Sequence, residues 1–165
     1  MERSPEGHVE GPVMKADTIV VGFDGSDNSH RALEAAMELV SEQGIVHVVT
    51  AFHMRSAAQT AEMMASLPEE FRGSFDLMEG PRTHLHDAEA LLDNGGVDHK
   101  GHLVEDDPAS AILDVADEVG ADLVIVGSRG LGRVARFLRG SVSTRVASHA
   151  RTSFLVVTDH GGDEE

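Results

Sequence analysis

Short apolar runs separated by helix-like segments restrict the fold of this chain more than any other feature of its sequence. The runs occupy residues 18–23, 46–52, 99–104, 123–126 and 154–157. Brief runs with few polar interruptions are typical of strands that are buried on both faces of a parallel sheet. Because strand-like and helix-like segments alternate throughout, the sequence predicts an α/β domain whose parallel sheet is covered by helices on both faces.

The segments between the runs carry the signals of helix starts and ends. A turn and cap at 24–26 precede apolar residues at helical spacing over 33–40, and we expect Gly44 to end that helix. Asp107-Pro108 is a strong helix start, because it places a hydrogen-bond acceptor at the cap and a proline at the first position. Further helices are expected over 57–67, ended by Pro68, over 83–92, ended by Asn94-Gly95-Gly96, and over 141–149, with a variable loop over 69–81.

The length of 165 residues matches one ordinary domain. We expect residues 1–14 to form a disordered extension, 15–160 to form the domain and 161–165 to be an acidic tail. No run approaches the ~20 apolar residues of a membrane helix, and no early apolar stretch suggests a signal peptide, so we expect a cytoplasmic protein without membrane contact. The absence of cysteine excludes disulfides, thiolate nucleophiles and thiolate metal sites.

The charge balance is strongly acidic, with 29 acidic and 13 basic residues and a net charge of −16. Such a surface repels nucleic acid, so we expect no nucleic-acid partner. Only Lys15 and Lys100 are lysines, a composition that resembles proteins of salt-loving organisms. In contrast, the stretch 127–158 contains no acidic residue and contains the arginines Arg129, Arg133, Arg136, Arg139, Arg145 and Arg151. This local excess of positive charge favours an anion site.

Glycines in the same stretch have a spacing that suits phosphate binding. From Gly127 the sequence reads GSRGLGRVARFLRGSVS, in which two residues separate Gly127 from Gly130 and nine residues separate Gly130 from Gly140. Glycines let backbone N–H groups approach a phosphate, and the start of the last helix, at Gly140-Ser141, provides further N–H groups. The loop is not a Walker loop, since no lysine lies nearby, and it is not the dinucleotide fingerprint, which follows the first strand. The glycines by themselves are equally compatible with simple turns.

Ligands of open parallel sheets bind at the carboxyl ends of the strands. Three segments are expected there: Gly22-Phe23-Asp24, Thr50-Ala51-Phe52, and the start of the glycine loop at Val126-Gly127-Ser128-Arg129-Gly130. These segments are therefore the candidate binding site.

Several sequence segments are similar to the signature segments of the universal stress protein family. They are VGFDGS after the first run, DDPASAIL, ADLVIVGSRG, and RGSVSTRVASHA followed by FLVV, and the resemblance covers residues 15–158. It implies an open five-stranded parallel sheet in the order 3-2-1-4-5, a Rossmann-like fold of the adenine-nucleotide alpha hydrolase type. It also implies a stress-response regulator or sensor that binds ATP, or ADP or AMP, with Mg²⁺. Because the sequence offers no positioned general base for hydrolysis, we expect a binder that is at most a slow ATPase and not an enzyme.

The resemblance also implies roles for individual residues. Phosphate contacts fall on Gly127, Gly130, Gly140, Ser141 and Ser143. Asp24 helps to place the nucleotide and its metal, and Ala51 lies against adenine. The full set of candidate nucleotide-binding residues is Gly22, Phe23, Asp24, Ala51, Val126, Gly127, Ser128, Arg129, Gly130, Arg133, Gly140, Ser141, Val142 and Ser143. An apolar strand at the sheet edge, residues 154–158, is expected to form a homodimer.

Alternatives remain open at this point. The chain could be a family member that binds no nucleotide and acts through protein partners. An enzyme of the ATP-pyrophosphatase type needs an SGGxDS-like loop after the first strand, where this chain has GFDGSDNS. We expect His84, His86, His99 and His102 to be surface residues and not metal ligands. The segment 69–97 matches no family pattern, and Thr152-Ser153 departs from the usual pair before the last strand.

Overall fold

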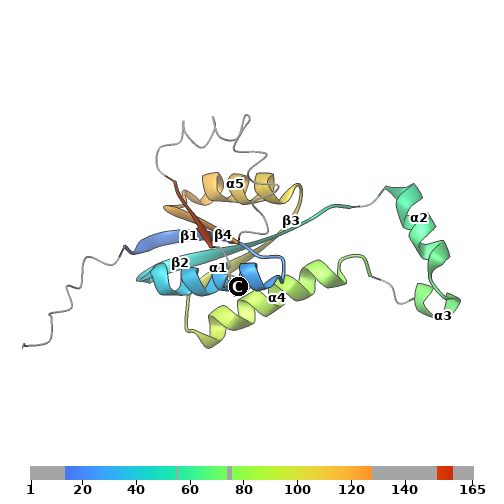
Figure 1. Cartoon of the computed structure of the whole chain (residues 1–165), viewed down its shortest axis with the longest axis horizontal. Helices are drawn as coiled ribbons and strands as arrows, with labels where there is room; N and C mark the ends of the chain where they lie inside the picture. The colour runs from blue at the N-terminus through green and yellow to red at the C-terminus, as the bar shows by residue number, and fades with distance from the viewer. Residues whose placement is uncertain (1–13, 55, 74–75, 128–151, 158–165) are drawn as a thin grey trace, which may run out of the picture.

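The computed structural model describes residues 14–54, 56–73, 76–127 and 152–157, and these residues contain one five-stranded sheet. The strand order is β3-β2-β1-β4-β5, and every neighbouring pair is parallel, which confirms the predicted topology (Figure 1). The strands are β1 Ala16–Gly22, β2 Val40–Phe52, β3 His99–Glu105, β4 Leu123–Gly127 and β5 Ser153–Val157.

Helices cover both faces of the sheet, as predicted (Figure 1). Helices α1 (Asp27–Leu39) and α4 (Glu79–Asn94) pack on one face, where their apolar residues meet Ile19 and Val21 of β1. Helix α5 (Pro108–Val119) packs on the opposite face against Val20. Successive residues of a strand point to opposite faces, so β1 contributes to two separate cores.

The central strand β1 is held at its amino end by a side chain from far along the chain. The carboxylate of Asp122, just before β4, accepts hydrogen bonds from the backbone N–H groups of Asp17 and Thr18 at 3.2 and 2.9 Å. On its other side, β1 pairs with β2, where Val20 lies opposite His47. The strand thus connects two parts of the chain that are distant in sequence.

Helix α1 ends earlier than its apolar spacing predicts. It ends at Leu39, and the extended residue Val40 begins β2, so the expectation that the helix continues until Gly44 is wrong. Val40 is buried, and the ammonium of Lys15 donates to the carbonyls of Glu38 and Val40, which fixes the helix end. Gly44 instead permits close packing of the irregular start of β2, because a Cβ there would lie 2.8 Å from the carbonyl oxygen of Asp17.

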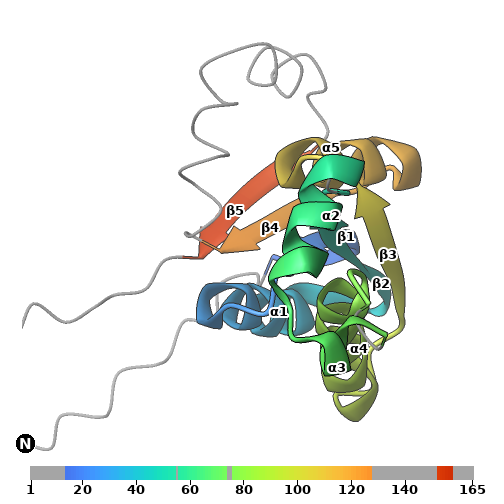
Figure 2. The same ribbon diagram turned by 90° about the vertical axis from the view of Figure 1, so that its right-hand side faces the viewer.

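The segment expected to be a loop over 69–81 is partly helical. It contains α3 (Glu69–Arg72) and the start of α4, which begins at Glu79 and not at 83. Pro81 lies in the first turn of α4, where a missing N–H is tolerated. Helix α2 (Ala57–Ser66) has no buried residue, and α2 and α3 lie beyond the carboxyl end of β2 (Figure 2).

The predicted start of α5 is confirmed. Asp107 is its N-cap and accepts a hydrogen bond from the N–H of Ala109 at 3.1 Å, with Pro108 at the first position. Gly120 ends the helix in the left-handed conformation, at a φ of +64°. The predicted helix over 141–149, residues 1–13 of the expected extension and the expected tail 161–165 lie outside the described residues.

Candidate functional site

A pocket of about 710 Å³ lies at the carboxyl ends of β1 and β2. Asp24 follows β1, Ala51 belongs to β2, and both line this pocket, so two residues predicted from separate segments share one cavity. The complete lining is Asp24, Thr50, Ala51, Phe52, His53, Met54, Met63, Asp76, Leu77, Met78, Glu79, Gly80, Pro81 and His84. The pocket lies where parallel sheets bind their ligands.

Hydrogen bonds between β1 and β2 fix the base of this pocket. The buried hydroxyl of Thr50 donates to the carbonyl of Phe23 at 3.0 Å, and the N–H of Phe23 donates to the carbonyl of Val49 at 2.9 Å. The Phe23 ring is only 3% exposed and packs edge-on against His30, with ring centroids 4.8 Å apart. The side chain of Phe23, a predicted site residue, therefore faces the core, and both of its backbone polar groups bind β2.

Asp24 begins the turn that leads into α1. Its carboxylate accepts a hydrogen bond from the N–H of Ser26 at 3.0 Å, and Ser26 in turn caps α1. Burial works to raise the pKa of Asp24, but hydrogen bonds, chiefly from the side chain and backbone of Ser26, outweigh it and hold the pKa below its usual value. The exposed carboxylate is therefore an anion at neutral pH, able to accept hydrogen bonds from a ribose or from metal-bound water.

Gly25 connects Asp24 to the cap in a conformation that favours glycine, with a φ of +78°. A Cβ at this position would also lie 2.7 Å from the imidazole of His84. His84 of α4 therefore packs over this turn as well as lining the pocket, and it is partly buried, contrary to the prediction of a surface histidine.

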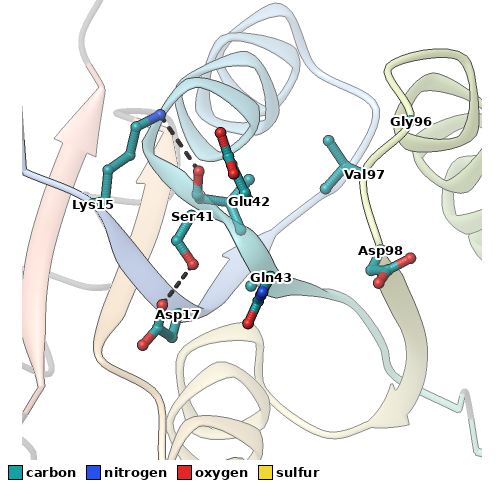
Figure 3. A pocket seen from close by; sticks show the side chains of 10 residues that line it. Lys15, Asp17, Ser41, Glu42, Gln43, Gly96, Val97 and Asp98 are labelled. Atoms are coloured by element: carbon teal, nitrogen blue, oxygen red, sulfur yellow. Dashed lines mark hydrogen bonds between the residues drawn. The ribbon is translucent and has the colours of Figure 1, made fainter.

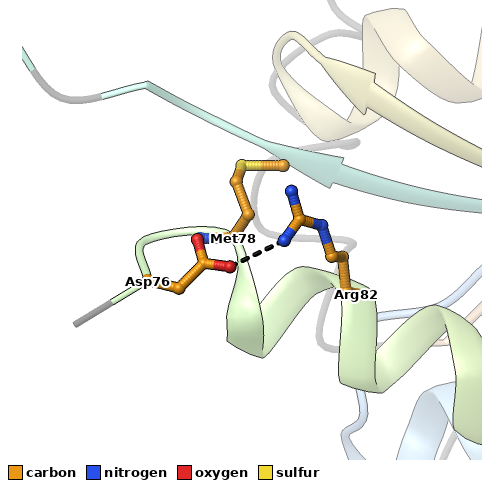
Figure 4. A network of polar contacts seen from close by, with 3 residues as sticks. All are labelled: Asp76, Met78 and Arg82. Carbon is orange, nitrogen blue, oxygen red and sulfur yellow. Dashed lines mark hydrogen bonds and ion pairs between the residues drawn. The ribbon is translucent and has the colours of Figure 1, made fainter. Parts of the chain in front are cut away.

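The outer wall of the pocket comes partly from the segment 69–97, which no sequence pattern could place, and partly from residues just after β2 and on α2. It is formed largely by apolar side chains, Met54, Met63, Leu77, Met78 and Pro81. Asp76 fixes the start of α4, since its carboxylate accepts hydrogen bonds from the N–H of Met78 at 2.8 Å and from the guanidinium of Arg82 at 2.6 Å (Figure 4). In the sequence, this helix start is indicated only by Asp76, a potential capping residue a few positions before Pro81.

The ends of β1 and β4 form the other part of the predicted site. The strand order reverses between β1 and β4, so a crevice is expected between the carboxyl ends of these two strands. Gly127 ends β4 against the first turn of α1, where a Cβ would lie 2.7 Å from the backbone of Asn28. Gly22 meets α5, and a Cβ there would lie 2.5 Å from the terminal methyl group of Ile112. Both glycines thus have a packing role that does not require a ligand.

Val126 is 4% exposed and packs into the core beneath α5, so its side chain does not face the crevice. The remaining candidate residues, Ser128, Arg129, Gly130, Arg133, Gly140, Ser141, Val142 and Ser143, lie outside the described residues. Of the predicted set, the structure therefore unites Asp24 and Ala51 in a pocket and places Gly22 and Gly127 at the ends of paired strands.

A second pocket of about 710 Å³ lies at the opposite end of the sheet (Figure 3). Its polar groups already bind one another: the hydroxyl of Ser41 donates to the carboxylate of Asp17, and Lys15 donates to backbone carbonyls at the end of α1. This pocket has none of the predicted site residues, and its hydrogen bonds account for Lys15, Asp17 and Ser41 as structural groups.

Histidines form one close pair that sequence reasoning missed. Nδ1 of His47 lies 2.9 Å from Nε2 of His102, and His47 is 7% exposed. His99 and His102 are partly buried, so the prediction that they are surface residues is wrong. His86 is exposed, as predicted. Within the described ranges, no group of three or more histidines or carboxylates could hold a metal ion. No helix in this part of the chain is long and apolar enough to cross a membrane.

Comparisons with known proteins agree with this fold. A family model described as the universal stress protein family matches residues 15–158. A universal stress protein of Mycobacterium tuberculosis is 31% identical over 142 residues, which cover 85% of this chain and 94% of that protein. The universal stress protein YxiE of Bacillus subtilis is 31% identical over 148 residues, covering 84% and 97%. Among solved structures, a universal stress protein crystallised in complex with cAMP has 30% sequence identity to this chain and superposes with a TM-score of 0.55. The match covers 87% of this chain and 97% of that one.

Proposed function

The chain belongs to the universal stress protein family, and on this premise we propose that it is a stress-response regulator or sensor that binds an adenine nucleotide. The ligand is ATP, or ADP or AMP, bound at the carboxyl ends of β1, β2 and β4. The observation that carries this proposal is the pocket that Asp24 and Ala51 share. Its volume of about 710 Å³ lies within the usual range for small-molecule sites.

The chemistry of the pocket suits a nucleoside. In the proposed complex, adenine lies against Ala51 and the apolar outer wall, and the ribose lies near the carboxylate of Asp24. The related protein that is 30% identical binds a cyclic adenine nucleotide, cAMP, which supports the choice of base. We assign the phosphate contacts to Gly127, Gly130, Gly140, Ser141 and Ser143, on the basis of their spacing and of the arginines between them.

Magnesium fits this site as a companion of the nucleotide. Mg²⁺ in nucleotide sites is bound by phosphate oxygens and water, with only one or two carboxylates from the protein. The anionic carboxylate of Asp24 is one such group, and it would hold the ion through water. The ion would neutralise phosphate charge.

We propose binding and not turnover, with at most slow ATP hydrolysis, because phosphoryl transfer needs an aligned water and several positioned charges. We also propose that the protein is cytoplasmic and adapted to high salt. It would be a homodimer, because β5 pairs only with β4 among the described strands and leaves the edge at 154–157 for a second copy. Residue 158 of the predicted edge lies outside the described residues.

The proposal is tested by calorimetric titration of ATP into wild type and a Gly130→Ala variant. If the glycine loop holds phosphate, affinity falls about tenfold or more, corresponding to about 1.4 kcal/mol, while the melting temperature without ligand changes by only a few degrees. Gly140→Ala should act in the same way. Gly73→Ala is the matched control, since a Cβ at Gly73 would meet no atom within 4 Å. Absence of binding by wild type at millimolar ATP would reject the proposal in favour of a family member that acts through protein partners.

A further inference from the structure

Three of the seven methionines of this chain line the proposed nucleotide pocket. Met54 follows β2, Met63 lies on α2, and Met78 precedes α4, so three separate segments of the chain place a thioether at one cavity. We call these three residues the methionine wall. Thr50 and Ala51 of β2 line the same pocket.

The methionine wall is accessible to small molecules. Met54 is 61% exposed, and Met63 and Met78 are partly exposed. Other methionines are placed differently: Met64 neighbours Met63 on α2 but does not line the pocket, and Met37 packs against the core on α1. Since the chain has no cysteine, a peroxide that enters this pocket meets sulfur only as thioether.

We propose that the methionine wall is an oxidation site through which peroxide lowers the affinity of the pocket for its nucleotide, an inference that rests on the proposed function. In the reaction, a sulfur lone pair attacks one oxygen of hydrogen peroxide, an S–O bond forms and the O–O bond breaks. The sulfur loses two electrons and becomes a sulfoxide, and the second oxygen leaves as water after proton transfer. Methionine sulfoxide reductases reverse the change.

Oxidation reduces nucleotide binding for two physical reasons. A thioether makes favourable contacts with aromatic rings, and these are lost when the sulfur becomes a sulfoxide. The sulfoxide oxygen is a strong acceptor that prefers water, so the base must now displace water from a polar surface. Because three thioethers line one cavity, their oxidation makes three of its apolar side chains polar at once.

The test measures ATP affinity before and after hydrogen peroxide, with peptide mass spectrometry to assign each sulfoxide. We expect Met54, Met63 and Met78 of wild type to gain oxygen and the affinity to fall about tenfold. Treatment with methionine sulfoxide reductases should restore the affinity. The variant Met54→Leu/Met63→Leu/Met78→Leu keeps an apolar wall that cannot be oxidised, so its affinity, whatever its starting value, should be the same before and after peroxide.

The matched control is Met14→Leu/Met64→Leu, which removes two methionines outside the pocket and should stay as sensitive as wild type. If the triple variant fails to fold, Met63→Leu and Met78→Leu are tested singly, and each should lose part of the sensitivity. The inference is overturned if fully oxidised wild type keeps its affinity, if the triple variant loses affinity like wild type, or if the wall resists oxidation. Absence of ATP binding before any peroxide is a different result, because it rejects the proposed function and, with it, this inference.

Discussion

Gly127 shows at the scale of one residue how a glycine of the proposed phosphate loop can also be required for packing. Its Cα faces the first turn of α1, where a Cβ would lie 2.7 Å from both the carbonyl carbon and the oxygen of Asn28. Backbone atoms cannot move aside as a flexible side chain can. Gly127 therefore differs from Gly130, whose replacement is expected to act on ligand affinity.

We predict that Gly127→Ala destabilises the protein by about 1–3 kcal/mol even without nucleotide, the usual cost of inserting a methyl group into a packed region. The measurement is urea denaturation of wild type and variant, both free of ligand. The Gly73→Ala control should leave the midpoint unchanged, because its side chain has open space. An unchanged midpoint for Gly127→Ala would mean that the close contact with α1 relaxes without cost.

Asp24 gives a second prediction at this scale, which concerns pH. The folded-state pKa of Asp24 lies below the unfolded value of 3.8, because hydrogen bonds from Ser26 outweigh the effect of burial. Its contribution to stability is therefore fully present above about pH 3.8 and is lost as the pH falls through the folded-state pKa. We expect Asp24→Asn to be less stable than wild type at neutral pH and the difference to shrink in acid. A difference that stays constant over the titration would contradict the role of the ionised carboxylate.

Individual site residues could be predicted only in part, for a physical reason. Asp24 and Ala51 line one pocket at the strand ends where the sequence predicts them, because loop and strand-end positions follow from the strand pattern. The side chains of Phe23 and Val126 turned out to be buried. In a strand covered on both faces, both sets of side chains are apolar, so the sequence does not show which residue faces a ligand.

At the scale of secondary-structure elements, the next prediction concerns the neighbouring strands β2 and β3, which contain His47 and His102. Burial lowers the pKa of both imidazoles; the neighbouring His102 and Lys100 lower that of His47 further, and Glu118 of α5 acts in the opposite direction. Since both folded-state values lie below the unfolded value of 6.5, the unfolded chain binds protons first. Stability is therefore expected to fall as the pH drops through about 6.5 toward the folded-state values.

Urea midpoints measured between neutral pH and about pH 5.5 check this expectation, a range in which unperturbed histidines titrate. The double variant His47→Leu/His102→Leu should lose the extra dependence on pH, whatever its stability at neutral pH. His86→Leu, at an exposed position, should keep the wild-type dependence. Equal dependence in the double variant and wild type would assign the effect to other groups.

Element boundaries were predicted well where the signal is local and poorly where it is not. The start of α5 follows from Asp107 and Pro108, which are adjacent in sequence. The end of α1 depends on Lys15, which caps it from the start of β1. The start of α4 depends on Asp76 and Arg82, which meet only once the helix has formed. Contacts of these kinds leave no periodicity in the sequence.

The whole molecule carries 29 acidic and 13 basic residues, and this imbalance yields a prediction about salt. Repulsion among like charges opposes the compact state, and dissolved ions screen it. We expect the thermal midpoint to be higher in molar potassium chloride than in dilute buffer. An uncharged osmolyte at matched water activity is the control. Equal midpoints in dilute buffer and in salt would contradict the interpretation that this composition is adapted to high salt.

The strand order of the whole sheet was predicted through a family resemblance and not from periodicity. Apolar runs reveal that strands exist, but they do not reveal which strands are neighbours. The runs alone are compatible with several parallel arrangements, whereas the signature segments from VGFDGS to FLVV specify one.

The central position of β1 has a consequence for the growing chain during synthesis. On one side, the hydrogen bond between Asp17 and Ser41 spans only 24 residues, while on the other the bond between Thr18 and Asp122 spans 104. Closing the shorter loop costs less entropy, so β1, α1 and β2 can associate as soon as they leave the ribosome. Until β4 is made, the other edge of β1 stays unpaired. During that interval the nascent chain carries an open apolar strand edge, where it is most exposed to wrong pairing with other chains.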